Sequence, residues 1–479
     1  MTFNSIEFLI FYPAVLLLYF LLPKVCKWPM LLIASYFFYA FYSPSLALLI
    51  FGTTLVSWCC AMLMEKTERV CIRRTLLIIT LTVCLGVLFF YKYFDFLSES
   101  IAALFGRDPL LLNLILPVGI SFYTFQTLSY VIDVYRREIK TEKNFFFYAL
   151  FVSFFPQLVA GPIERPSNLI PQLRSFHKFS WDNFKAGGKF MLLGFFKKIC
   201  IADLVAPYVN AVYNNAGEST SLTVIIATLL FALQIYCDFS GYTDIAIGCA
   251  RMMGIKLMKN FDHPYRAETV KEFWSRWHIS LSSWFRDYLY IPLGGNRCRR
   301  YRHLLNLFIV FLVSGLWHGA AWTFVIWGAL HGIYQIIGTL TYKKRNLLLA
   351  KIGLCERSVC VRAVRRIITF ILVCVGWVFF RANSISDAFT LFKNLFTSHT
   401  SASGAFEALG LSTVNLLLIV SAFLVLLILD SLVTYEGDGD GSDALVLGGS
   451  FVYLIWVILI VWLLLFSKDM ISTFIYFAF

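Results

Sequence analysis

The sequence predicts an all-α polytopic membrane protein, and three observations support this fold class. Of the 479 residues, 59% are hydrophobic and only 14% are charged, whereas soluble globular chains carry about 25% charged residues. Apolar runs of about 20 residues, the length that crosses a bilayer as a helix, recur along the chain. The polar segments between them are rich in lysine and arginine, as cytoplasmic loops of membrane proteins are.

About eleven segments qualify as spans in a single membrane domain over residues 1–479. These are 3–22, 30–43, 46–63, 75–94, 110–134, 144–163, 221–250, 304–338, 363–381, 413–433 and 444–467. The segment 304–338 is long enough to break into two helices. Lysines interrupt the apolar pattern of residues 184–213, so we expect an interfacial or partly inserted helix there. Residues 255–302 are too polar to span, and we expect helices that lie at the membrane surface or dip into it.

The charge pattern predicts the orientation of the chain. The net charge of +13 resides in loops between apolar segments, and no separate polar domain suited to nucleic acid is visible. We therefore expect contact with membrane lipid, cytoplasmic basic loops and an N-terminus outside. The acidic loop 436–443 conflicts with this count, but acidic residues contribute little to orientation. The 12 cysteines form no CxxC pair and no HExxH occurs, so no metal site is predicted.

His318 is a candidate catalytic residue because it lies inside an apolar segment. Polar groups in hydrocarbon are costly and tend to face a cavity or partner. Its neighbours Gly315 and Gly319 are small and allow a substrate to approach. Imidazole is also the side chain whose ordinary pKa allows base chemistry near neutral pH. On an unbroken helix His331 would point away from His318, so we assign His331 to packing.

His278 lies in an aromatic stretch whose 3.6-residue spacing predicts one amphipathic helix. The helical face comprises Trp274, Trp277, His278, Leu281, Phe285 and Tyr288. From this pattern alone, a packed structural histidine is favoured over a catalytic one.

Two further polar segments allow both a structural and a functional interpretation. Gln234 and Asp238 lie four residues apart and share a helical face, where they could form a polar network or contact substrate. The prolines and glycine of 155–165 break a span near its end. This break is either a helix exit or irregular backbone beside a cavity.

In this order, these segments resemble the membrane-bound O-acyltransferase (MBOAT) family, most closely its bacterial alginate O-acetylation branch. The resemblance covers roughly 110–382 as the catalytic core, with N-terminal spans in 1–109 and C-terminal spans plus an aromatic tail in 413–479. Its motifs are Pro117-Val118-Gly119-Ile120-Ser121-Phe122, Gly161-Pro162-Ile163-Glu164-Arg165, Asp238-Phe239-Ser240-Gly241-Tyr242-Thr243-Asp244, Phe273-Trp274-Ser275-Arg276-Trp277-His278, Arg286-Asp287-Tyr288-Leu289-Tyr290, Gly294-Gly295-Asn296-Arg297 and Gly315-Leu316-Trp317-His318-Gly319.

The resemblance implies a multi-helix barrel with a central funnel, located in the bacterial cytoplasmic membrane. It implies transfer of an acyl group, with acetyl expected, from acetyl-CoA or an acyl-carrier thioester to an exported polysaccharide or peptidoglycan hydroxyl. It further implies that no cofactor is bound and that an extracellular SGNH-type acetyltransferase or esterase-like partner completes the transfer. The resemblance assigns catalysis to His318 and overturns the structural interpretation of His278. We expect substrate contacts from Asp238, Ser240, Tyr242, Trp277, Arg286 and Trp317.

Two mechanisms are compatible with these residues. His318 could act as a general base, with His278, Arg286 or a tryptophan N–H stabilising the oxyanion. Alternatively, His318 could carry the acyl group covalently. The composition of the aromatic run Phe474–Phe479 favours an interfacial aromatic belt. The run also resembles the terminal motif, with a central tyrosine, of a small partner protein in the D-alanyl branch, which makes Tyr476 a candidate acyl relay. Competing functions are D-alanyl transfer to teichoic acid, a transporter or flippase, and a scaffold of an export complex.

Overall fold

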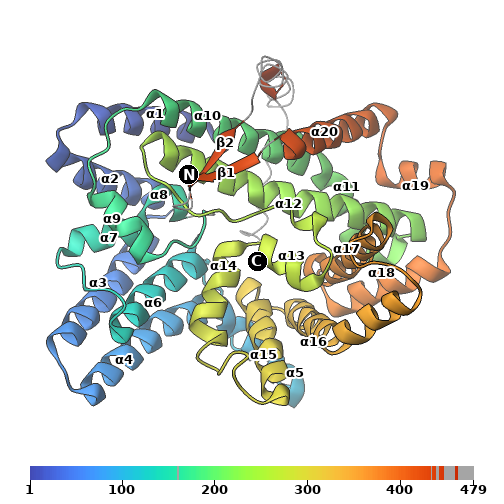
Figure 1. The fold of residues 1–479 in the computed structure, drawn as a ribbon, viewed down its shortest axis with the longest axis horizontal. Helices are drawn as coiled ribbons and strands as arrows, with labels where there is room; N and C mark the ends of the chain where they lie inside the picture. The colour runs from blue at the N-terminus through green and yellow to red at the C-terminus, as the bar shows by residue number, and fades with distance from the viewer. Residues whose placement is uncertain (42, 159–160, 433, 439–441, 447–458, 462–479) are drawn as a thin grey trace. The chain divides into compact units, whose positions relative to one another are not determined.

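The structure is a computed structural model that describes residues 1–41, 43–158, 161–432, 434–438, 442–446 and 459–461. Within these residues all regular secondary structure is helical except for one two-stranded sheet, β1 (Thr434–Asp438) paired with β2 (Ser442–Val446) (Figure 1). The all-α membrane class is confirmed. The expected span at 444–467 is wrong at its start, where residues 444–446 belong to β2, and nearly all of the remainder lies outside the described residues.

Among the described residues, six helical segments are long and apolar enough to cross a membrane. They are Pro44–Lys66, Val70–Phe105, Ser221–Met252, Trp322–Lys351, Val359–Arg381 and Thr413–Asp430. The chain divides into two compact units. The first comprises Met1–Phe195, Tyr242–Met258 and Tyr435–Val446, and the second includes Phe196–Gly241 and Lys259–Thr434.

The first unit is built from the N-terminal helices. These are α1 (Ile6–Leu21), α2 (Lys24–Ala40), α3 (Pro44–Lys66), α4 (Val70–Leu88), the π-helix η1 (Phe89–Tyr93), α5 (Phe94–Phe105), α6 (Ile120–Arg136), α7 (Phe145–Ser153), α8 (Phe155–Leu158), α9 (Pro166–Arg174) and α10 (Trp181–Phe195). The expected span 110–134 is wrong in its first part, because helix begins only at Ile120. Pro117 and Gly119, the latter with φ of 74°, keep the preceding chain out of the helix.

The motif 161–165 contains one buried carboxyl group, that of Glu164. Its side chain is fully buried and accepts hydrogen bonds from Asn168 Nδ2 at 2.7 Å and from the backbone N–H of Met258. Burial raises the pKa of the Glu164 carboxyl to about 7. The motif is therefore more than a helix exit, since its carboxyl joins two distant segments of this unit.

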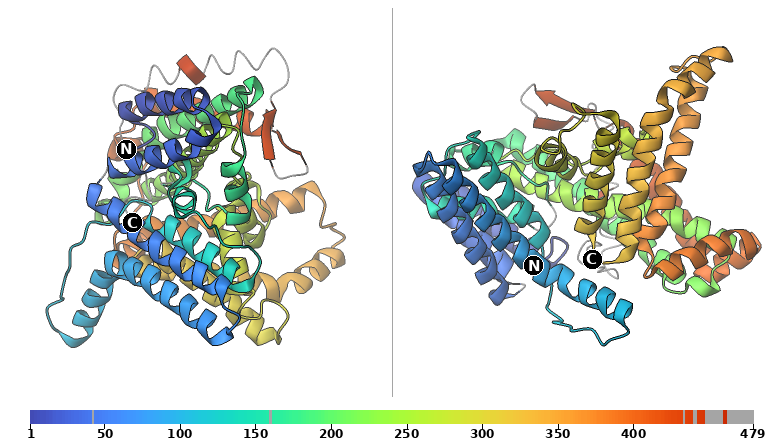
Figure 2. Two further views of the ribbon diagram at one scale, coloured as in Figure 1. Left: turned by 90° about the vertical axis from the view of Figure 1, so that its left-hand side faces the viewer. Right: turned by 90° about the horizontal axis from the view of Figure 1, so that it is seen from below.

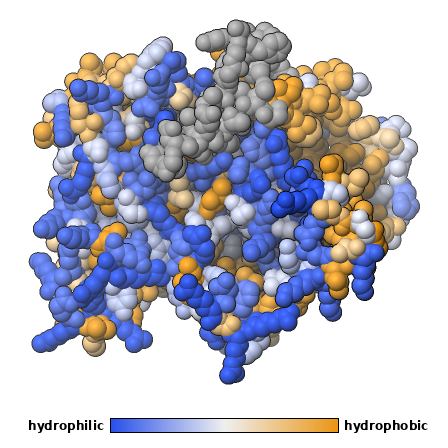
Figure 3. All heavy atoms as spheres, viewed as in Figure 1, coloured by the Kyte–Doolittle hydropathy of each residue, from blue (hydrophilic) through white to orange (hydrophobic). Residues whose placement is uncertain are grey.

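The second unit carries the longest helices. They are the π-helix η2 (Phe196–Asp203), α11 (Leu204–Tyr213), the short 3₁₀ turn η3 (Ala216–Glu218), α12 (Ser221–Met252, shared with the first unit), the 3₁₀ turn η4 (Pro264–Arg266), α13 (Val270–Arg276), α14 (Ile279–Phe285), the π-helix η5 (Arg286–Tyr290), α15 (Arg300–His318), α16 (Trp322–Lys351), α17 (Val359–Arg381), α18 (Ile385–Thr397), α19 (Ala402–Leu409) and α20 (Thr413–Leu432). Figure 3 shows apolar side chains gathered over α20, where Leu417 and Leu424 are exposed, as in a lipid-facing helix.

The predicted break in 304–338 is confirmed. Helix α15 ends at His318, and α16 begins at Trp322 and lies beside α15 (Figure 2). The two helices approach closely because glycines face each other. A Cβ added to Gly315 would lie 3.0 Å from the Gly328 Cα and 2.4 Å from the Phe324 carbonyl oxygen. Small residues at such a contact let helix backbones meet directly.

One sequence-based expectation for this unit is wrong. The single helix expected through 274–288 is broken, because His278 adopts a left-handed conformation with φ of 46° between α13 and α14. Within 184–213, where an interfacial or partly inserted helix is expected, Lys197 and Lys198 are buried, at 2% and 1% exposed.

Candidate active site

His318 lies at the C-terminal end of α15 inside a cage of aromatic rings. The imidazole is 2% exposed. Its ring centroid is 5.0 Å from Trp317, 4.9 Å from Trp327 and 5.5 Å from Phe380, each in an edge-to-face arrangement. The helix break at 319–321 turns the chain back, so that α16 supplies Trp327 to this cage. Packing from α15, α16 and α17 thus sets the orientation of the imidazole.

His331 lies against the same cage, contrary to expectation. Its ring centroid is 5.0 Å from Trp327, the ring that also contacts His318. The expectation assumed one continuous helix, whereas the break places the two histidines on antiparallel helices. Trp274 Nε1 donates to His331 Nδ1 at 3.2 Å, and a Cβ on Gly376 would lie 2.8 Å from Nε2. These are the contacts of a packed, hydrogen-bonded side chain.

His278 is the second histidine of the site and is fully buried. Its Nδ1 lies 3.0 Å from Oδ1 of Asn260, an oxygen that also accepts from the backbone N–H of Ser280 at 3.2 Å and from the Ser280 hydroxyl at 2.9 Å. Burial lowers the pKa of His278 to about 3, so the imidazole is neutral at physiological pH. Asn260 was not predicted from the sequence, because nothing in its spacing from His278 signals a contact.

Trp317 connects the two histidines. Its ring centroid lies 5.9 Å from that of His278 and 5.0 Å from that of His318. His278 also meets Phe239 on α12 edge to face, with 4.7 Å between ring centroids. The structure therefore brings together three of the predicted site residues, His278, Trp317 and His318, from two distant segments of the chain.

Asp238 takes part in a buried ion cluster beside this site. Lys198 Nζ lies 2.8 Å from Oδ1 of Asp203 and 2.8 Å from Oδ1 of Asp238, and all three side chains are almost fully buried. Burial opposes the charged form of Lys198, but the carboxylates of Asp238 and Asp203 outweigh it and raise its pKa. Asp238 thus anchors α12 to η2, while its neighbour Phe239 contacts His278.

The other predicted substrate residues are dispersed. Trp277 belongs to an aromatic cluster, with its ring 5.1 Å from Trp377. Arg286 has a side chain 64% exposed and pairs with Asp287 at 2.8 Å. Ser240 is buried, and Tyr242 belongs to the first unit, where its ring lies 6.0 Å from Phe3. Tyr476 lies outside the described residues.

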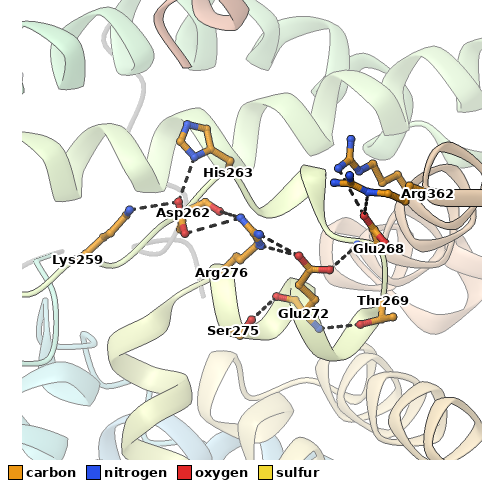
Figure 4. Close-up of polar contacts among 10 residues, drawn as sticks. Lys259, Asp262, His263, Glu268, Thr269, Glu272, Ser275, Arg276 and Arg362 are labelled. Atoms are coloured by element: carbon orange, nitrogen blue, oxygen red, sulfur yellow. Dashed lines mark hydrogen bonds and ion pairs between the residues drawn. The ribbon is translucent and has the colours of Figure 1, made fainter. Parts of the chain in front are cut away.

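A chain of polar contacts holds the segment between Asn260 and His278 (Figure 4). Arg276 pairs with Glu272 at 2.9 Å and donates to the Asp262 carbonyl at 3.3 Å. Glu268 continues the chain to α17 through Arg362, at 2.6 Å. The segment that carries His278 is therefore tied to a long helix rather than left as a loop.

No group of three or more metal-ligating side chains occurs in the part of the chain that the structure describes. The site consists instead of two buried imidazoles joined by an indole, which suits proton transfer and acyl transfer.

Comparison with known proteins identifies the class of enzyme. The family model for membrane-bound O-acyltransferases matches residues 136–375. The chain belongs to this family and is a membrane O-acyltransferase. This membership favours acyl transfer over the transporter and scaffold alternatives.

Several relatives have names that describe polysaccharide modification. The chain is 38% identical over 440 residues to a probable alginate O-acetylase AlgI of Pseudomonas aeruginosa, and the match covers 89% of this chain and 81% of that protein. It is 35% identical over 419 residues to a peptidoglycan O-acetyltransferase of Helicobacter pylori, covering 80% and 77%. A teichoic acid D-alanyltransferase of Bacillus subtilis is 28% identical over 279 residues, covering 56% and 69%.

Proposed function

We propose that the enzyme transfers an acetyl group from a cytoplasmic thioester toward a hydroxyl of an exported polysaccharide or peptidoglycan. The observation that carries this proposal is the buried His278–Trp317–His318 arrangement in a chain whose closer relatives are named for O-acetylation. The D-alanyltransferase relative is less similar, which favours acetyl over D-alanyl as the acyl group.

His318 serves as the general base. Its neutral imidazole takes the proton of the acceptor hydroxyl as the oxygen attacks the thioester carbonyl carbon. The carbon–sulfur bond then breaks, the departing thiolate receives the proton, and an ester and a free thiol result. Proton transfer of this kind contributes about 10²–10⁴-fold to a rate.

The covalent alternative is an acyl-histidine. In the general-base mechanism no acetyl-histidine accumulates, so after mixing with radiolabelled acetyl-CoA and a rapid denaturing quench no label is found on a peptide containing His318. Label retained on a peptide containing His318 would replace the general-base role with nucleophilic catalysis.

The central test compares His318→Ala with His303→Ala, a half-buried histidine on the same helix α15. Purified membranes receive labelled acetyl-CoA, and label in polysaccharide is counted. We expect the His318 variant to lose transfer and the His303 variant to keep it, with equal membrane expression. Near-normal transfer by His318→Ala contradicts the assignment of His318 as the base. If the enzyme accepts only a D-alanyl carrier as donor, the transferred group is D-alanyl and not acetyl.

The donor is attracted by a basic surface between η5 and the first turn of α15. Four exposed arginines form it: Arg297, Arg299, Arg300 and Arg302. A phosphate-bearing donor, such as coenzyme A or a phosphopantetheine arm, is attracted by such a patch, and salt screens the attraction. The donor KM should rise between about 50 and about 300 mM salt. An unchanged KM would show that electrostatic attraction by these arginines does not contribute to donor binding.

The acceptor side involves a relay and a partner. The positive-inside pattern supports an extracytoplasmic N-terminus. We propose Tyr476 as a transient acyl carrier that passes the group to an extracellular SGNH-type partner, since a phenyl ester is more reactive than an alkyl ester. Tyr476→Phe keeps the ring and removes the hydroxyl. Loss of polysaccharide acetylation supports the relay, and full acetylation rejects it.

A further inference from the structure

We propose that Asn260 is a positioning residue that fixes His278 as the Nδ1–H tautomer, so that His278 accepts a hydrogen bond from the acceptor substrate at Nε2. This inference rests on the proposed function, because it assigns His278 to the binding of a hydroxyl-bearing acceptor. It also replaces the expectation that His278 donates a hydrogen bond to the oxyanion.

The Asn260 amide has one orientation that satisfies its neighbours. The oxygen and nitrogen of an asparagine side chain are assigned from their hydrogen-bond partners. The backbone N–H of Ser280 can only donate, and it lies 3.2 Å from the Asn260 amide atom. That atom must therefore be the oxygen, and the Ser280 hydroxyl at 2.9 Å supplies a second donor to it.

This oxygen sets the tautomer of His278. The Nδ1 atom lies 3.0 Å from the same oxygen, which has only lone pairs to offer. A lone pair on Nδ1 would face these lone pairs, so Nδ1 carries the hydrogen. The Ser280 hydroxyl is 3.5 Å from Nδ1 and only 2.9 Å from the amide oxygen, so it does not supply a competing donor to the ring. In the neutral ring the lone pair then lies at Nε2.

The backbone around His278 is held by the same residue, independently of the side-chain hydrogen bonds. His278 has φ of 46° and ψ of 55°, a left-handed conformation that is unfavourable for a residue with a Cβ. The Asn260 carbonyl accepts from the backbone N–H of Ile279 at 2.9 Å, and Asp262 N–H donates to the Arg276 carbonyl at 2.9 Å. Asn260 thus holds both the backbone turn and the ring, and strain of this kind is concentrated at functional sites.

The tautomer determines what Nε2 can do. A neutral Nδ1–H imidazole has no hydrogen at Nε2, so it cannot donate to an oxyanion from that atom. It can accept a hydrogen bond from a hydroxyl and orient it, while His318 takes the proton of the attacking hydroxyl. Burial supports the neutral form, since it lowers the pKa of His278 to about 3.

Several other titratable or charged groups lie on the elements around His278. They are His318 on α15, Asp238, Lys198 and Asp203 on α12 and η2, Lys259, Asp262 and His263 on the Asn260 segment, and Arg276 on α13. The hydrogen bond from His263, together with Lys259, outweighs burial and holds the pKa of the Asp262 carboxyl below its ordinary value. Asp262 therefore stays ionised above about pH 5.

The test uses Asn260→Asp, which keeps an acceptor oxygen and adds a negative charge beside the ring. An opposite charge at this distance raises the pKa of an imidazole by about 1–3. Protonated His278 has a hydrogen at Nε2 and can no longer accept there, so kcat/KM of the variant relative to that of the wild type should fall as pH is lowered. A ratio that is constant with pH, or that rises at low pH, overturns the proposal.

A second measurement keeps the proposal testable without activity. Full-length protein labelled with ¹⁵N-histidine, compared with His278→Gln, identifies the His278 signals. We expect a protonated Nδ1 and an unprotonated Nε2 at neutral pH. The reverse pattern overturns the proposal even where transfer is normal, whereas absent transfer with the expected pattern counts against the proposed function instead.

Discussion

The imidazole of His318 meets the indole of Trp327 edge to face, with 4.9 Å between ring centroids and an interplanar angle of 87°. The contact joins the last residue of α15 to the second turn of α16 and closes the break between them. Trp327 is fully buried and also contacts His331 on α16 and Trp377 on α17. The position of the proposed base therefore depends on packing among α15, α16 and α17.

Replacing Trp327 should lower turnover by misplacing His318. Trp327→Ala removes the edge-to-face contact and leaves a cavity, and we expect kcat to fall at least about tenfold, since small displacements of a catalytic group are costly. Trp327→Phe keeps a ring and should lose less. The matched control is Trp322→Ala, on the same helix but 52% exposed. Equal losses in the two alanine variants would contradict this role.

The lysine of the buried ion cluster should contribute strongly to folding. Lys198→Met leaves the carboxylates of Asp203 and Asp238 buried without their shared cation, a loss of about 3–5 kcal/mol in the free energy of unfolding. Thermal unfolding of detergent-purified protein measures the loss. Lys185→Met, at an exposed pair with Asp182, should change the midpoint little. A Lys198 variant as stable as the Lys185 variant would show that the cluster contributes nothing to stability.

The close packing of α15 against α16 predicts opposite effects for two glycines of α16. A Cβ on Gly328 would lie 2.5 Å from the Phe311 carbonyl oxygen, so Gly328→Ala should cost about 1–3 kcal/mol. A Cβ on Gly338 would have no atom within 4 Å, and Gly338→Ala should be neutral or stabilising by up to about 1 kcal/mol. The two midpoints of thermal unfolding, measured side by side, check the sign of each effect.

Stability should fall with rising pH through the titration of Glu164. Its pKa is raised from 4.5 to about 7 by burial, so the folded state holds this proton more tightly than the unfolded state. The stabilisation is present below pH 4.5 and is lost as pH rises toward 7 and above. Glu164→Gln cannot ionise, so its unfolding midpoint relative to that of the wild type should rise between about pH 5 and about pH 8.

The matched control for this titration is Glu138→Gln, at a side chain 58% exposed. Its midpoint should follow that of the wild type across the same pH range. A constant difference between Glu164→Gln and wild type would show that the carboxyl does not titrate in this range.

Local pattern alone predicted much of the fold and identified one candidate residue of the site. Apolar runs identified the six span-length helical segments, because the length of a bilayer-crossing helix is set by the membrane and not by the partners it packs against. The division of the apolar segment 304–338 into two helices followed from its length, which exceeds a single span, whereas the position of the break after His318 came from the structure. His318 was selected as a candidate because a histidine in an apolar run is unusual on energetic grounds.

The partners of each site residue were decided only by the tertiary structure. Asn260 and His278 lie 18 residues apart, and Lys198 and Asp238 belong to different helices, so neither contact leaves a helical or strand periodicity in the sequence. The left-handed turn at His278 was missed for the same reason, since residues from another segment stabilise it against its intrinsic cost. Residue type thus determined which side chains could do chemistry, and packing between distant segments decided their orientation, ionisation and tautomer.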